Sequence, residues 1–77
     1  MRITEKYLNE VCDDINEMFK TRNVSVEYYV CSRNGYTAID KRVDNKSPNT
    51  VDSALSKREA LYIFNGIKEA LQTAMPV

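Results

Sequence analysis

The dipeptide Asn34-Gly35 lies between two stretches in which apolar and polar residues alternate. A two-residue type I′ hairpin turn needs positive φ at both central residues, and asparagine and glycine tolerate that conformation best. The alternation over residues 24–31 has the period of a half-buried strand. The sequence therefore predicts an antiparallel hairpin over residues 23–43 that turns at Asn34-Gly35.

The register of this hairpin follows from counting outward from the turn. Three cross-strand pairs result: Val30 with Ile39, Val26 with Val43, and Glu27 with Arg42. The first two pairs are apolar and share one face, whereas the third joins opposite charges on the other face. Because a shift of one residue would destroy both matches, the register is strongly specified.

A capping box predicts the start of the closing helix. The Ser56 hydroxyl can accept the N–H of Glu59, and the Glu59 carboxylate can accept the N–H of Ser56. Apolar residues then recur at helical spacing at positions 61, 64, 67 and 71. We expect a helix near residues 56–73, in which Gly66 permits close approach to the first helix or the sheet.

The first helix is predicted near residues 4–20, with Thr4 as its cap. One face of it is apolar: Leu8, Val11, Cys12, Ile15, Met18 and Phe19. The opposite face is acidic: Glu10, Asp13, Asp14 and Glu17. This division is typical of a helix that packs one side on a core and presents the other to water.

The elements together predict an α+β fold. Residues 1–77 form one domain, with a small antiparallel sheet of two or three strands and the N- and C-terminal helices packed on one of its faces. The segment after the hairpin is polar and turn-rich, and a third strand could form near residues 50–53.

Composition narrows the classes of function. Eleven basic and eleven acidic residues give no net charge, which argues against a chain devoted to binding phosphates or an anionic membrane. The sequence has no apolar run of membrane-spanning length, and its first residues lack the apolar core of a signal peptide. Two cysteines are too few for a disulfide-stapled secreted domain. We expect a cytoplasmic protein with a buried Cys12 and a free thiol at Cys31.

Residues that carry catalytic chemistry are sparse. The chain lacks histidine, the commonest general base, and its two glycines do not form a phosphate-binding loop. Asp13 and Glu17 lie one helical turn apart, but a hard cation needs more oxygen ligands than this pair supplies. Cys31 has no neighbouring base to activate it. We expect no enzymatic activity, no cofactor, no bound metal and no small-molecule substrate.

The closing segment Ser56-Lys57-Arg58-Glu59-Ala60, after an α-β-β-β order, resembles the double-stranded RNA-binding domain. In that family the last helix begins with a serine, paired basic residues and a small residue. The resemblance implies phosphate contacts from Lys57 and Arg58, with Lys41 and Lys46 as further basic residues. This nucleic-acid-binding function is the alternative hypothesis, since a neutral chain gains little from counterion release.

A second resemblance spans most of the chain. The N-terminal segment with Tyr7, Leu8, Asn9 and Ile15, the central Gly35-Tyr36 and the closing Ser56-to-Tyr62 segment are similar to short uncharacterised proteins of bacteriophages and other mobile elements. These residues are mainly caps, turns and core positions. The resemblance implies a fold and a genomic setting but no particular activity.

The remaining hypothesis is a protein-interaction module. Tyr29 and Tyr36 are predicted on the sheet face opposite the core, beside the Glu27–Arg42 pair. Tyrosine is favoured at binding hot spots. The expected partner is another protein, and it could be a second copy bound through this face or through the edge of the second strand.

Overall fold

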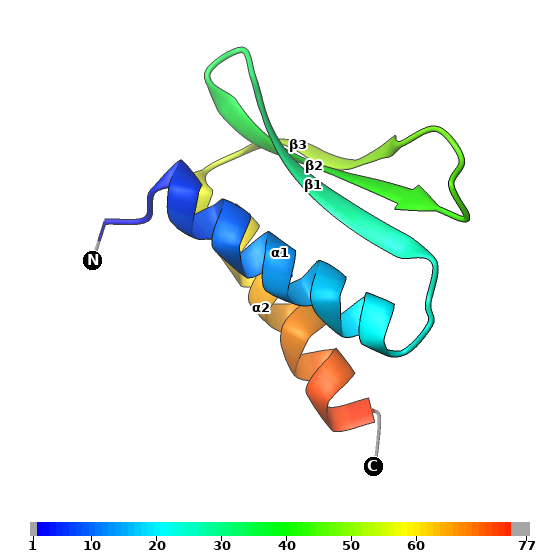
Figure 1. Ribbon diagram of the computed structural model, residues 1–77. Coiled ribbons are helices and arrows are strands. Elements are labelled where there is room, and N and C mark those ends of the chain that lie inside the picture. The colour runs from blue at the N-terminus through cyan, green and yellow to red at the C-terminus, as the bar shows by residue number, and fades with distance from the viewer. Residues whose placement is uncertain (1, 75–77) are drawn as a thin grey trace.

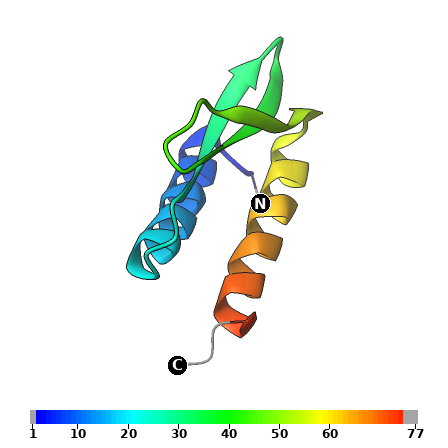
Figure 2. The ribbon, with the colours of Figure 1, turned by 90° about the vertical axis from the view of Figure 1, so that its right-hand side faces the viewer.

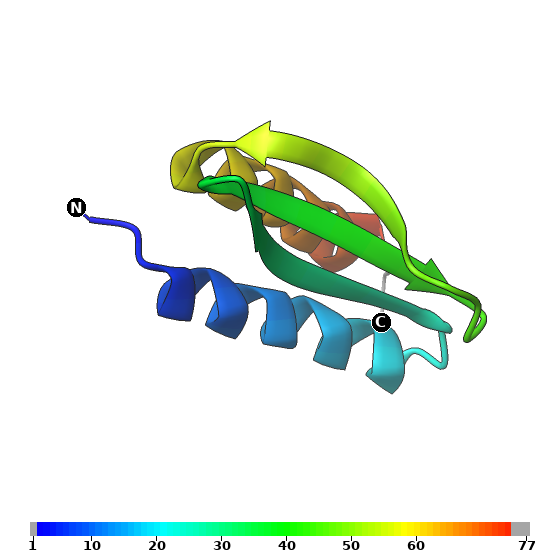
Figure 3. The ribbon, with the colours of Figure 1, turned by 90° about the horizontal axis from the view of Figure 1, so that it is seen from above.

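The computed structural model describes residues 2–74, and its elements follow in the order α1 (Glu5–Thr21), β1 (Val26–Arg33), β2 (Tyr36–Val43), β3 (Asn49–Leu55) and α2 (Lys57–Ala74). Both helices lie on the same side of a three-stranded antiparallel sheet (Figures 1 and 2). They run side by side in the same direction beneath it (Figure 3). The predicted α+β fold is confirmed, and the sheet is of the three-stranded kind.

The hairpin between β1 and β2 has the predicted register. Asn34 and Gly35 have φ of 53° and 79°, as a type I′ turn requires. The three predicted pairs all form: Val30 with Ile39, Val26 with Val43, and Glu27 with Arg42. Matching on both faces of the hairpin was therefore sufficient to fix its alignment.

The third strand is longer than the segment expected from the sequence, and it pairs with β2. The strand order is β1-β2-β3, so β2 lies in the centre of the sheet. The prediction that a second copy could bind the edge of the second strand is therefore wrong, because β3 occupies that edge. The β2–β3 pairing shifts register twice, and Ala54 has a positive φ of 60°.

Both helices begin at their predicted caps. The Thr4 hydroxyl oxygen accepts a hydrogen bond from the N–H of Tyr7 at 3.1 Å. At the start of α2, the N–H of Ser56 donates to the Glu59 carboxylate at 2.9 Å, and the N–H of Glu59 donates to the Ser56 hydroxyl at 3.1 Å. Each bond satisfies a backbone donor that the helix leaves unpaired.

The core lies between the helices and the sheet. Its buried residues come from both helices, from β2 and from the end of β3: Leu8, Val11, Cys12, Ile15, Ile39, Leu55, Ala60 and Phe64. The Tyr28 ring extends this core from β1, stacking near Phe19 and meeting Phe64 edge to face. Cys12 is buried as predicted, and desolvation raises the pKa of its thiol to about 11. This thiol is therefore protonated at neutral pH.

Arg22 joins the C-terminal ends of the two helices. Its guanidinium donates to the carbonyl oxygens of Met18 in α1 and Leu71 in α2, each at 3.3 Å. Both carbonyls belong to last turns, where backbone acceptors lack helical partners and the helix dipole favours a cation. One side chain thus stabilises two helix ends and fixes their spacing.

The expectation for Gly66 is wrong. A Cβ added at this glycine would have no heavy atom of a neighbouring element within 4 Å, and Gly66 is exposed. It does not provide close approach to α1 or to the sheet. It only weakens α2, because glycine in a helix interior is less favourable than alanine.

Replacing Gly66 with alanine is therefore expected to stabilise the protein by about 0.5–1 kcal/mol. For a domain of this size the midpoint of thermal unfolding should rise by roughly 4–8 °C per kcal/mol. Gly35→Ala is the matched control and should destabilise, because its φ of 79° strains any residue with a Cβ. A Gly66→Ala variant that melts below the wild type would contradict the open environment of this glycine.

Candidate functional site

The sheet has one face that neither helix covers (Figure 3). Because alternate side chains point to opposite faces, and Tyr28, Val30 and Ile39 pack with the core, their neighbours point away from it. We call this surface the open face; its residues are Glu27, Tyr29, Cys31, Arg33, Tyr36, Ala38, Asp40 and Arg42, together with Thr50 of β3. It contains all four residues that the sequence singled out for protein binding.

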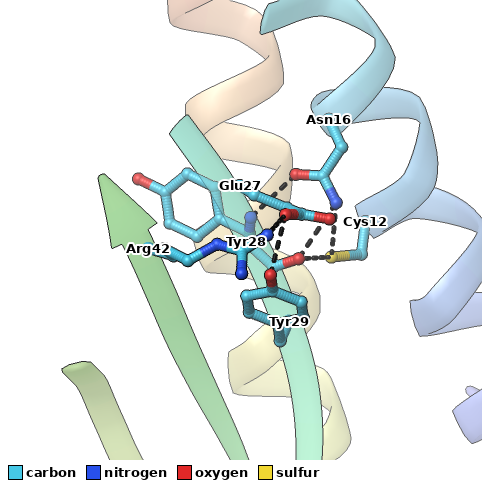
Figure 4. A network of polar contacts seen from close by, with 6 residues as sticks. All are labelled: Cys12, Asn16, Glu27, Tyr28, Tyr29 and Arg42. Atoms are coloured by element: carbon cyan, nitrogen blue, oxygen red, sulfur yellow. Dashed lines mark hydrogen bonds and ion pairs between the residues drawn. The ribbon is translucent and has the colours of Figure 1, made fainter. Parts of the chain in front are cut away.

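Glu27, Tyr29 and Arg42 form one hydrogen-bonded cluster (Figure 4). The Tyr29 hydroxyl and the Arg42 guanidinium both donate to Oε1 of Glu27, at 2.7 and 2.5 Å. The guanidinium carbon also lies 5.7 Å from the centroid of the Tyr29 ring. These donors lower the pKa of Glu27, first through Tyr29 and then through Arg42. The predicted charge pair is present, and it also holds the tyrosine ring in place.

A second charge pair occupies the middle of the open face. Arg33 donates to both carboxylate oxygens of Asp40, at 3.1 and 2.6 Å, and one of the same nitrogens reaches the Thr50 hydroxyl at 3.4 Å. Asp40 is only 8% exposed, and the hydrogen bonds from Arg33 lower its pKa. The Cys31 thiol lies 3.6 Å from the same carboxylate. The pKa of this thiol is raised, chiefly by burial. Sequence reasoning missed this pair, although both residues fall on the same face of the predicted register.

Tyr36 does not belong to the cluster of Glu27, Tyr29 and Arg42. It lies opposite Arg33 at the hairpin end of the sheet and is 56% exposed. Ala38 and Asp40 separate it along β2 from Arg42. The structure therefore places Tyr36 at the hairpin end of the open face and Tyr29 two same-face pairs farther along it, opposite Asp40. Tyr29 is held by its hydrogen bond to Glu27, whereas Tyr36 projects into solvent.

The basic residues of the nucleic-acid hypothesis do not gather into one patch. Lys57 and Arg58 begin α2, immediately after β3, whereas Lys46 lies in the turn between β2 and β3. Lys41 pairs with Asn49 at the start of β3, far along the strand from the residues that lead into α2. Two of the four residues therefore lie at each end of the sheet.

Asn16 ties α1 to the outer edge of β1 (Figure 4). Its side-chain Oδ1 accepts the N–H of Tyr28 at 2.8 Å, and its Nδ2 donates to the carbonyl oxygen of Tyr28 at 2.9 Å. The Cys12 thiol donates to the same carbonyl at 3.1 Å. The amide thereby replaces the neighbouring strand that Tyr28 lacks on this side. Sequence reasoning missed Asn16, whose one signal is its place in the helix beside the apolar residue Ile15.

A groove of about 510 Å³ lies between α1 and the beginning of β1. Its walls mix both charge signs with small apolar and amide side chains: Asp13, Asn16, Glu17, Lys20, Val24, Ser25, Val26, Glu27, Arg42 and Asn45. Within residues 2–74, no group of three or more histidine, cysteine, aspartate or glutamate side chains is placed to hold a metal ion. The same part of the chain has no helix of the length and apolarity needed to span a membrane.

Comparison with known proteins gives no further assignment. No protein-family model matches the chain, and no curated protein and no solved structure matches it either. The interpretation of the open face therefore depends on the geometry of its own residues.

Proposed function

We propose that this chain acts by binding another protein through the open face, as a small non-enzymatic accessory of bacteriophage or mobile-element origin. The observation that carries the proposal is the uncovered side of the sheet, which holds an exposed Tyr36 and a hydrogen-bonded Tyr29. Aromatic and arginine side chains dominate the binding energy of many protein interfaces. The open face presents two of each, since Arg33 and Arg42 accompany the tyrosines.

The side chains of the open face are organised before a partner arrives. Arg33 is held by two hydrogen bonds to Asp40, and Arg42 and Tyr29 are held by Glu27. Side chains that are already ordered lose less conformational entropy on association. Their charges are also paired within the chain, so burial would not leave an isolated ion.

The edges of the sheet are less suited to binding than its face. At β1, Asn16 already bonds the outward N–H and carbonyl of Tyr28. At β3, the register shifts and the positive φ of Ala54 disturb the regular spacing that an added strand would need. Addition of a partner strand is therefore disfavoured at both edges, and we accordingly place the partner on the open face.

Replacing Tyr36 with alanine is expected to reduce capture of the protein partner at least about tenfold, the loss typical of a hot-spot residue. The measurement is affinity capture from cells that encode the chain, quantified by mass spectrometry. Tyr62→Ala is the matched control: Tyr62 is 69% exposed but lies on α2, away from the open face. Its removal should leave capture unchanged.

The same proteins also test the nucleic-acid hypothesis. A duplex RNA titration at two salt concentrations would show a steep loss of affinity with salt if phosphate contacts dominated. Salt-sensitive micromolar binding that weakens in a Lys57→Ala, Arg58→Ala variant would contradict protein binding through the open face. Equal capture by the Tyr36→Ala and Tyr62→Ala variants would contradict it as well.

A further inference from the structure

We infer that the partner fitting the open face is a second copy of this chain, packed face to face about a two-fold axis with the strands of the two copies antiparallel. This inference rests on the proposed function and adds the identity and alignment of the partner. A two-fold interface requires that residue i contacts residue j while residue j contacts residue i. The order of residues along β1 and β2 is such that the residues paired in this way are complementary.

The reversal brings complementary side chains together at both ends of the face. Along β2 the open-face residues run Tyr36, Ala38, Asp40 and Arg42, so reversal places Tyr36 opposite Arg42 of the partner subunit. An arginine over an aromatic face is a favourable contact. Tyr36 has the exposure needed to reach it, and the Arg42 side chain remains 36% exposed beside Glu27.

The other strand gives a second, independent match. Along β1 the residues run Glu27, Tyr29, Cys31 and Arg33, so the same reversal places Arg33 opposite Glu27 of the partner subunit. Both side chains are partly exposed, at 44% each. A two-fold axis along the strands would instead keep them parallel and reverse their order, so that β1 faces β3 and, on the central strand β2, Arg42 faces Arg42 of the partner subunit. The charge pattern thus selects the antiparallel alignment, because like charges in contact destabilise an interface.

The size of the face sets the strength of the dimer. Three strands at about 4.8 Å spacing and eight residues at about 3.3 Å cover roughly 14 by 26 Å. This is less than half of the roughly 800 Å² that each partner buries in a standard stable complex. The dimer should therefore be weak and concentration-dependent, and it should be sought from about 10 μM to 1 mM.

Charge at position 36 provides the test. In the Tyr36→Lys variant, an introduced ammonium group would face the Arg42 guanidinium of the partner subunit at both symmetry-related contacts of the dimer. This repulsion should raise the dimer dissociation constant at least about a hundredfold. In the Tyr36→Glu variant, an introduced carboxylate would face the same guanidinium with the opposite charge. The dimer dissociation constant of this variant should stay within about threefold of the wild-type value. Sedimentation equilibrium measures both constants. Circular dichroism checks that each variant is folded, and Tyr62→Lys controls for the added charge elsewhere.

A second measurement does not depend on any variant. In a mixture of labelled and unlabelled wild-type chains, isotope-filtered NOEs should connect the Tyr36 ring with the Arg42 side chain of the partner subunit. Equal weakening by lysine and glutamate, or the absence of these NOEs in a dimer, would overturn the antiparallel alignment. A wild type that stays monomeric at 1 mM would overturn the dimer. The proposed function would then still be decided separately, by capture with the Tyr36→Ala and Tyr62→Ala variants.

Discussion

Replacing Phe64 with alanine is expected to lower the free energy of unfolding by about 3–5 kcal/mol. Phe64 is fully buried, and it is among the four largest fully buried side chains of the described residues. Its ring also meets Tyr28 edge to face, with centroids 6.4 Å apart. The loss includes both the burial of the ring and the cavity that its removal leaves, because neighbouring side chains fill such space only in part.

The loss is large against the total stability of so short a chain. At 0.05–0.15 kcal/mol per residue, 77 residues are stabilised by roughly 4–12 kcal/mol. The alanine variant should therefore lose roughly a quarter or more of its total stability and unfold at a much lower urea concentration than the wild type, as measured by circular dichroism. Tyr62→Ala, two residues earlier on the exposed side of α2, should change stability by less than about 0.5 kcal/mol. Equal effects at the two positions would contradict the orientation of α2.

The hairpin and the helix starts were predictable because several local signals agreed. Asn34-Gly35 determines the turn, and two kinds of cross-strand match select the same register. The capping residues Thr4 and Ser56 stand directly before the helices that they begin. Each of these signals acts between residues that are close in sequence or directly opposite in a strand pair.

Features that depend on long-range packing were harder to predict. The bounds of β3 could not be set, since its residues do not alternate regularly and its pairing shifts register twice. Gly66 was misinterpreted because a helical glycine carries the same sequence signal whether its surroundings are crowded or open. The members of the open face that come from β1 and β2 were predictable from the hairpin register alone, but Thr50 of β3 was not. The division of its residues into a cluster around Glu27 and a separate Tyr36 needed the side-chain positions.

Asn16 shows most clearly what one sequence leaves undetermined. Asn9 and Asn16 both lie in α1, and both are polar residues within a helix. The Asn9 side chain donates to the carbonyl of Glu5 within its own helix, at 3.1 Å. Asn16 bonds both backbone groups of Tyr28, twelve residues away on another element. The difference arises only when β1 packs against α1.

Replacing Asn16 with alanine is accordingly expected to destabilise the protein by about 1–3 kcal/mol, because two backbone groups of a partly buried residue lose their partners. Asn9→Ala should be neutral or slightly stabilising, since alanine is the better helix former. Urea denaturation measures both changes. Hydrogen exchange adds a local test, in which the Tyr28 amide should lose protection in Asn16→Ala and keep it in Asn9→Ala. Unchanged protection in both variants would contradict the bond from Asn16.

Asn16→Asp separates the two halves of this contact. The introduced carboxyl group can accept the Tyr28 N–H, but it can donate to the Tyr28 carbonyl only when protonated. Protonation is therefore favoured in the folded state, and the folded pKa lies above the unfolded value of about 3.9. The stabilisation by such a group is complete below the unfolded pKa and is lost as pH rises through the folded pKa. Relative to the wild type, Asn16→Asp should thus regain stability as pH falls from about 7 to about 4, whereas Asn16→Ala should not. The same pH profile for both variants would mean that the Tyr28 carbonyl gains nothing from a donor at position 16.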